Sequence, residues 1–287
     1  MRERVRAALS FRRFAALTTV TTLTLVCLGV YTAATGSGLA CSAQWPLCDN
    51  GLLPQTVPSF IEWFHRLVAM VTGFLILGTA GWAWRAGDRR TLRPAVLAAV
   101  LLPVQVSIGA VTVTLDGIFP GGYSPPTQAA HLFGALAIFT ALAVTTLRAY
   151  DEGITDAPLD RARRALPAAL AVLLVAVVIS RLVPLYPYTP ATQAAFFGVS
   201  LALYATLLAA GRWLGAADRP AERGLVAVAV LAVFVAMVLG RDLVFYTETV
   251  RLVNAAVFAV GFVAVGLAAW RVRGDAVPET APQATGD

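Results

Sequence analysis

Lysine is absent from this chain, histidine occurs only twice and cysteine three times. Charged residues make up 13% of the 287 residues and hydrophobic ones 58%, and mean hydropathy is +0.74. So few charges exclude an ordinary soluble domain, and so few cysteines exclude a disulfide-rich secreted scaffold. The net charge of +6 comes entirely from arginines in short helix-flanking segments without a binding-module pattern, so no nucleic acid is expected as a partner.

Apolar runs recur along the chain. A spanning helix needs about 20 mostly apolar residues. The sequence predicts eight such helices, at residues 14–35, 59–84, 94–114, 126–147, 165–183, 190–211, 224–244 and 250–270. We therefore expect an all-α polytopic membrane protein. The first run follows an arginine-rich segment without a small-residue cleavage site, so we interpret it as a retained helix.

The arginines are unequally distributed between the two ends of the predicted helices. If the N-terminus is cytoplasmic, 18 of the 22 arginines lie on the cytoplasmic side, and the other side keeps Arg66, Arg181, Arg241 and Arg251. The positive-inside rule then predicts a multi-pass protein of the cell membrane with both termini in the cytoplasm. The loop that contains Cys41 and Cys48 would lie outside the cytoplasm.

A polar loop at 148–164 divides the predicted helices into two sets of four. We expect two tandem four-helix bundles, at residues 1–150 and 151–273. The remaining segment, 274–287, is rich in proline, alanine and acidic residues, and is predicted to be disordered.

The two halves also show a loose internal repeat. Residues 127–139 align with 250–262, which sets Asn254 against His131, and residues 61–70 align with 192–201, which sets Phe196 against His65. Four helices separate the copies, so the repeat would be parallel rather than inverted.

Cys41 and Cys48 enclose a short loop that contains Trp45 and Pro46. Thiols outside the cytoplasm tend to oxidise to disulfides. The spacing allows a structural disulfide, a redox-active disulfide or two unpaired thiols. Cys27 lies in the middle of the first predicted helix, where it is interpreted as a small apolar residue.

The two histidines are predicted to lie at one depth. His65 follows Pro58 by seven residues and His131 follows Pro126 by five, on helices that run in the same direction. At about 1.5 Å per residue, both would lie about 8–11 Å below the outer boundary. Two imidazoles without nearby carboxylate or cysteine partners make a poor zinc site, and a di-iron site needs a second Glu-x-x-His motif. A haem iron needs only one or two axial imidazoles, so a bis-histidine haem, a structural polar pair and another ligand stay open.

Glu62 lies three residues before His65 and four before Arg66, so all three side chains share one side of a helix. One interpretation is an interfacial Glu62–Arg66 ion pair. The other is an acid beside a bound cofactor, with Arg66 near the outer surface, where it would meet haem propionates.

Four segments carry a family resemblance: "TGSGLACSAQWPLCDNG" at 35–51, "EWFHR" at 62–66, "LLPVQVSIGAVTV" at 101–113 and "TQAAHLFGA" at 127–135. Together they resemble the haem A synthase family, the membrane enzymes that supply haem A for terminal oxidases, over roughly residues 14–147.

The resemblance implies an oxidoreductase that converts the C8 methyl group of haem O to a formyl group by successive hydroxylation. It implies His65 and His131 as iron ligands, Glu62 as the acidic residue that the reaction needs, and a Cys41–Cys48 disulfide. Haem O, haem A or haem b would occupy the N-terminal bundle. The implied partners are the enzyme that makes haem O, an electron donor that the sequence does not identify, and membrane lipid. A homo-oligomer of the chain is compatible with this resemblance.

The second half departs from the family, whose members carry two further histidines there. This chain has none after His131, and Phe196 or Phe197 and Asn254 stand at the expected places. We therefore expect no second bis-histidine haem. A non-catalytic electron carrier or haem chaperone is the alternative to an enzyme. A transporter is disfavoured, because the predicted helices carry few polar groups at mid-membrane.

Overall fold

A computed structural model describes residues 10–114, 124–151, 156–185, 187–241 and 244–274. Within these ranges the chain forms eight long α-helices and a short 3-10 helix, η1 (Ser37–Leu39). The long helices are α2 (Phe11–Ala34), α3 (Val57–Ala86), α4 (Arg89–Thr114), α5 (Pro125–Asp151), α6 (Pro158–Val178), α7 (Pro190–Ala216), α8 (Pro220–Leu239) and α9 (Glu248–Gly274). No strand occurs in these ranges.

Proline and threonine mark where several helices begin. Thr56 accepts a hydrogen bond from the Ser59 backbone N–H at the start of α3, and Thr189 accepts one from Thr192 at the start of α7. Proline in the first helical turn has no N–H that needs a partner, and its fixed φ angle suits a helix. Pro58 and Pro190 occupy that turn in α3 and α7. These local signals are why the helix starts follow the predicted runs within a few residues.

Seven of the described helices are long and apolar enough to cross a membrane, in agreement with a multi-pass membrane protein. The exception is α6, for which the sequence predicts a span at 165–183 but which ends at Val178. Its first two turns carry four charged residues, Asp160, Arg161, Arg163 and Arg164. These charges leave α6 a shorter apolar stretch than the other helices have.

The other predicted boundaries differ mainly because the helices continue past the apolar run into polar flanking sequence. Helix α4 begins at Arg89 rather than residue 94, and α7 continues to Ala216 rather than 211. The reverse occurs in α8, which ends at Leu239, before Gly240, rather than at the predicted residue 244. The predicted disordered segment, 274–287, lies outside the described residues after Gly274.

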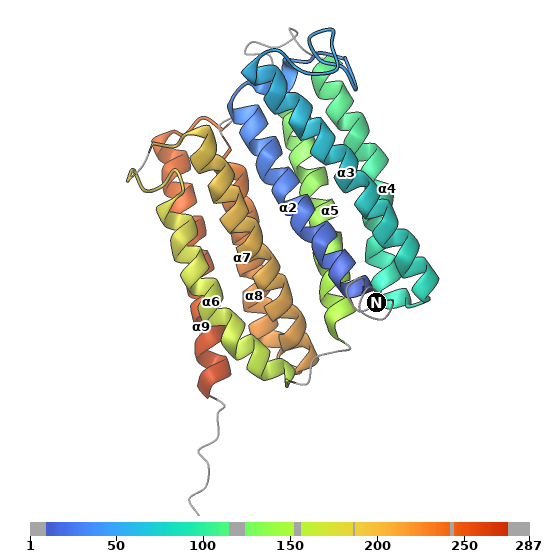
Figure 1. The fold of residues 1–287 in the computed structure, drawn as a ribbon. Coiled ribbons are helices and arrows are strands. Elements are labelled where there is room, and N and C mark those ends of the chain that lie inside the picture. The colour runs from blue at the N-terminus through green and yellow to red at the C-terminus, as the bar shows by residue number, and fades with distance from the viewer. Residues whose placement is uncertain (1–9, 115–123, 152–155, 186, 242–243, 275–287) are drawn as a thin grey trace, which may run out of the picture.

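The helices pack in two groups. Helix α2 contacts α3 and α5, and α4 lies against α3 and α5. In the second group α6, α7, α8 and α9 contact one another in turn, and α9 returns to α6. Helix α2 also packs along α7 and so joins the groups (Figure 1). The predicted division at 1–150 and 151–273 as separate units stays a prediction.

The hydrophobic core is unevenly distributed between the groups. Its main cluster combines buried side chains from α6–α9 with the facing sides of α2 and α5. A smaller cluster lies among α3, α4 and α5, with Ile76 and Leu142 as its largest members. The contact between the groups includes a 3.0 Å hydrogen bond between the hydroxyls of Thr140 and Tyr204. Side chains thus fill the interior of the second group continuously.

Candidate functional site

The two histidines lie on two helices of the first group, His65 on α3 and His131 on α5. These two helices are both packed against α2 and α4. The Nδ1 atom of each ring is buried and has no hydrogen-bond partner among the described residues. A buried polar nitrogen without a partner is energetically unfavourable, so each such atom calls for an explanation. Two such atoms in one group of helices suggest a ligand that both histidines serve.

Glycines on the two adjoining helices leave room for these rings. A Cβ atom at Gly29 of α2 would lie 3.0 Å from the Cε1 atom of His65. A Cβ atom at Gly109 of α4 would lie 3.2 Å from the Cε1 atom of His131. Sequence reasoning missed both glycines, because glycine is common in membrane helices and nothing local distinguishes these two. Each imidazole thus lies against a glycine of an adjoining helix, His65 against α2 and His131 against α4.

A hydrogen bond from α4 also holds the backbone of His131 in position. The Gln105 side-chain amide donates a 2.9 Å hydrogen bond to the backbone carbonyl of His131. Gln105 lies directly over Gly134, where a Cβ atom would come within 2.2 Å of its Oε1 atom. Only glycine at position 134 permits this approach, so the amide ties α4 to α5 at the level of the histidine.

An apolar pocket of about 520 Å³ lies between α4 and α5. Its lining consists mostly of aliphatic side chains, among them Val104 and Ile108 of α4 and Ala130 of α5. Ala130 precedes His131 in the chain, and Ile108 precedes Gly109. The pocket is therefore close in sequence to His131 and Gly109, but neither of them lines it.

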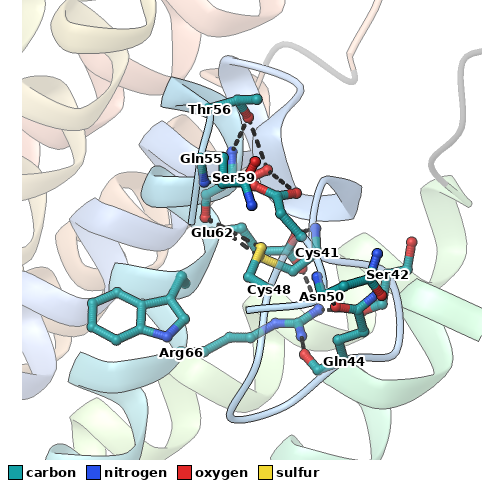
Figure 2. Close-up of a disulfide and its surroundings, with 12 residues drawn as sticks. Cys41, Ser42, Gln44, Cys48, Asn50, Gln55, Thr56, Ser59, Glu62 and Arg66 are labelled. Carbon is teal, nitrogen blue, oxygen red and sulfur yellow. Dashed lines mark hydrogen bonds and ion pairs between the residues drawn. A yellow bond between two sulfur atoms is a disulfide. The ribbon is translucent and has the colours of Figure 1, made fainter. Parts of the chain in front are cut away.

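The loop between α2 and α3 contains the Cys41–Cys48 disulfide, with a Cα–Cα distance of 4.8 Å. The alternative of two unpaired thiols is therefore wrong in this structure. Both cysteines are buried, and the Cys41 Sγ atom lies 3.4 Å from the Ser59 carbonyl oxygen in the first turn of α3 (Figure 2). The disulfide thus lies directly on the beginning of the helix that carries His65.

Glu62 and Arg66 fasten this loop to α3. The Glu62 carboxylate is 2% exposed, accepts a hydrogen bond from the Cys41 backbone N–H and forms an ion pair with Arg66. The Arg66 guanidinium also donates to the carbonyl oxygens of Gln44 at 2.7 Å and Ser42 at 2.8 Å (Figure 2). The Glu62–Arg66 ion pair of the first sequence interpretation is present, and it lies one helical turn from His65. The second interpretation, an acid beside a bound cofactor, stays a prediction. The role of Arg66 toward propionates stays a prediction, since its observed contacts are with the loop and Glu62.

Asp49 closes the other side of the loop. Its carboxylate accepts hydrogen bonds from the Gln55 backbone N–H at 2.7 Å and the Ser59 hydroxyl at 2.9 Å. These bonds favour the ionised form and hold the pKa of Asp49 below its usual range. The Trp63 indole N–H donates to the Pro46 carbonyl at 3.1 Å. The loop is therefore attached to α3 along the first turns of that helix.

These residues fit a haem held between two imidazoles. Neutral imidazole nitrogen is a normal axial ligand of haem iron, and each histidine offers a ring nitrogen without a protein partner. No group of three or more potential metal-binding side chains occurs in the described part of the chain. A site that relies on two imidazoles and a macrocycle needs no such group.

The corresponding positions of the second group are occupied differently. Phe196 and Phe197 are both buried in the main core. Phe196 lies so close to Gly240 that a Cβ atom there would come within 2.5 Å of its ring. Buried Asn254 donates a 2.8 Å hydrogen bond to the Tyr246 hydroxyl. At the positions that the repeat aligns with His65 and His131, the second group therefore has a packed aromatic ring and a hydrogen-bonded amide.

Comparison with known proteins finds one matching family model and several relatives. The family model for the cytochrome oxidase assembly protein matches residues 55–183. The heme A synthase of Bacillus licheniformis is 33% identical over 138 residues, which cover 47% of this chain and 44% of that protein. The heme A synthase of Geobacillus kaustophilus is 34% identical over 146 residues, 50% of this chain and 44% of that protein.

A third relative has a different name. The protoheme IX farnesyltransferase of Halobacterium salinarum is 37% identical over 136 residues, which cover 47% of this chain and 29% of that protein. In all three relatives the matched segment spans less than half of the relative's length. The matches confirm the family resemblance that the sequence motifs carry.

Proposed function

We propose that this chain is an enzyme of the haem A synthase type, which oxidises the C8 methyl group of haem O to the formyl group of haem A. Its similarity over about half of its length to the cytochrome oxidase assembly family and to two heme A synthases supports this proposal. The conversion comprises two successive hydroxylations of the methyl carbon. In each, dioxygen would supply one oxygen atom to the carbon and leave as water with the other, with two electrons and two protons from an external donor. The resulting geminal diol then loses water to give the formyl group. The observation that carries this proposal is the pair of buried, unpartnered imidazole nitrogens with the Glu62 carboxylate one helical turn from His65.

In this proposal His65 and His131 hold the haem iron from α3 and α5. When bound, the haem supplies the redox chemistry of its iron and carries the methyl group that is oxidised. Glu62 is fixed by the Cys41 N–H and by Arg66, so its carboxylate can hold or release a proton at a defined place one helical turn from His65. The disulfide loop covers this end of the site and restricts the access of water.

The apolar pocket between α4 and α5 supports a substrate with a long hydrocarbon substituent. Its lining residue Ala130 precedes His131 in the chain, and its lining residue Val104 is 53% exposed. The farnesyl-derived chain of haem O is hydrophobic and would leave the bundle at such a place. This arrangement is consistent with haem O as the substrate and with its synthase as the preceding enzyme.

The proposed topology has both termini in the cytoplasm and the disulfide loop on the opposite side. Two features support it. The predicted cytoplasmic loops hold most of the arginines, and the disulfide loop lies at the opposite end of the helices from the α3–α4 turn (Figure 1). A disulfide persists most readily outside the cytoplasm.

The direct test of the activity is pigment conversion. We expect cells that make haem O and express this chain to accumulate haem A or its hydroxylated precursor, detected by chromatography and mass spectrometry of extracted haems. Cells with the same haem O supply but without the chain are the control. Intact membrane-inserted protein that leaves haem O unchanged would contradict the enzyme and favour the non-catalytic haem-binding alternative.

The glycine contact with His65 gives a second test. Gly29→Ala places a methyl group 3.0 Å from the imidazole Cε1 atom, so the ring must move. Overpacking of this kind costs about 1–3 kcal/mol, and we expect haem affinity to fall about tenfold. Haem titration followed by absorption spectroscopy measures the change.

The matched control for this substitution is Gly81→Ala on α3, where a Cβ atom meets nothing within 4 Å. Alanine is the better helix former, so this variant should keep full haem affinity and stability. Equal haem affinity in the Gly29→Ala and Gly81→Ala variants would show that His65 does not ligate the haem from its observed position.

A further inference from the structure

Five arginines converge at the end of the molecule opposite the disulfide loop. Together they line a pocket of about 420 Å³. Arg89, Arg90 and Arg93 come from the beginning of α4, Arg148 from the end of α5, and Arg212 from the last turns of α7. The pocket therefore forms where the first and second groups of helices meet.

Part of this arrangement is held by hydrogen bonds. The Arg148 guanidinium donates to the Arg90 carbonyl, and Arg212 pairs with Asp151, with an Nε–Oδ2 distance of 3.0 Å. Within the described residues, Asp151 is the one carboxylate that forms an ion pair with the five arginines. Arg89 and Arg93 are exposed at the pocket and form no ion pair in that part of the chain.

Asp88 directly precedes Arg89 and Arg90, and its negative charge offsets only part of the positive charge around the pocket. Its carboxylate accepts hydrogen bonds from the backbone N–H groups of Arg90 at 2.9 Å and Thr91 at 3.1 Å, at the beginning of α4. These bonds hold the pKa of Asp88 below its usual range, so it stays ionised as a helix cap. The excess of positive charge around the pocket remains.

The distribution of arginine across the membrane accounts for positive charge on this side, but not for its convergence on one pocket. Guanidinium groups around a shared pocket repel one another, and the first turn of α4 is a place where the helix dipole disfavours cations. An anion with several oxygens would relieve both effects. Phosphate suits this role because guanidinium binds two of its oxygens in parallel.

We propose that this arginine pocket binds a phosphate-bearing anion and so bridges α4, α5 and α7 at the membrane surface. The pocket lies at helix ends, at the level of lipid headgroups, where basic pockets between membrane helices bind anionic lipids. The phosphate belongs either to an anionic phospholipid headgroup or to a soluble diphosphate. The site is independent of the proposed oxidation, because its arginines lie at the far end of the helices from His65 and His131.

The test uses the full-length protein purified in detergent and stripped of lipid. Thermal unfolding is followed while tetraoleoyl cardiolipin, inorganic diphosphate or neutral dioleoylphosphatidylcholine is titrated, because a ligand of the folded state raises the unfolding temperature. We expect a concentration-dependent rise with one or both phosphate anions beyond that with the neutral lipid. The double variant Arg89→Gln, Arg93→Gln should bind the anion about tenfold more weakly, since it loses two charge-assisted contacts.

The control is the double variant Arg223→Gln, Arg273→Gln, which removes the same charge from exposed positions outside the pocket at the same end of the helices. A rise with cardiolipin that diphosphate does not compete away identifies a lipid headgroup. A rise with diphosphate alone identifies a soluble phosphate compound. No rise in the wild-type protein, or an equal loss in both double variants, would overturn the proposed site.

Discussion

His65→Ala is expected to remove most of the haem from the purified protein. The side chain is the only contribution of α3 to the proposed iron ligation, and methyl in its place offers no donor atom. Loss of even an indirect support of a metal ligand typically weakens binding about 10- to 100-fold, so loss of the ligand itself should exceed this range. His131→Ala should have the same effect from α5. Absorption and electron paramagnetic resonance spectra, with haem counted per chain, measure both.

Three further measurements make this prediction specific. His65→Met keeps a side chain that can ligate iron and should retain haem with a changed low-spin spectrum. Phe64→Ala, at an adjacent position that is 41% exposed, should bind haem as the wild type does. The wild-type protein should hold about one bis-histidine haem per chain. Unchanged haem content in both histidine variants, or two such haems in the wild type, would contradict the assignment.

Glu62→Gln should abolish turnover and leave haem binding intact. Glutamine keeps the shape of the side chain and can still accept the Cys41 N–H, but it cannot exchange a proton. General acid–base groups contribute about 10²- to 10⁴-fold to a rate, and we expect a loss of that size in conversion of haem O. Conversion is measured from the extracted haems and divided by the haem bound per chain.

The matched control for Glu62 is Glu222 on α8. It is also a buried glutamate, 5% exposed and paired with a nearby arginine, Arg219, at an Oε1–Nη2 distance of 2.7 Å. Glu222→Gln therefore reproduces the loss of a buried, paired carboxylate far from the histidines and should keep normal turnover. To separate catalysis from attachment of the loop, the rate at which reductant opens the Cys41–Cys48 disulfide is compared in Glu62→Gln and wild type. Normal turnover in Glu62→Gln would exclude its catalytic role.

The sequence alone predicted the helices and most of the candidate residues, because both depend on local patterns. Apolar runs specify helices, and proline with threonine marks where they begin. The spacing of Glu62, His65 and Arg66 is by itself enough to put them on one side of a helix. The same reasoning was wrong for the end of α6, which the apolar run places at residue 183 but which lies at Val178.

Other features depend on which helices become neighbours, and this is decided by tertiary packing. Gly29 and Gly109 matter only because α2 and α4 press against the two imidazoles. Arg66 fastens the disulfide loop because the carbonyl groups of that loop fold back over α3.

The arginine pocket also depends partly on local sequence and partly on tertiary packing. The sequence identifies each arginine as a positive charge at a helix end, but residues 89–93, Arg148 and Arg212 come from three helices that are far apart in the chain. Their convergence follows from the contact of α2 with α7, which brings the two helix groups together. Periodicity along one helix carries no information about such contacts, because shape and packing between helices determine them.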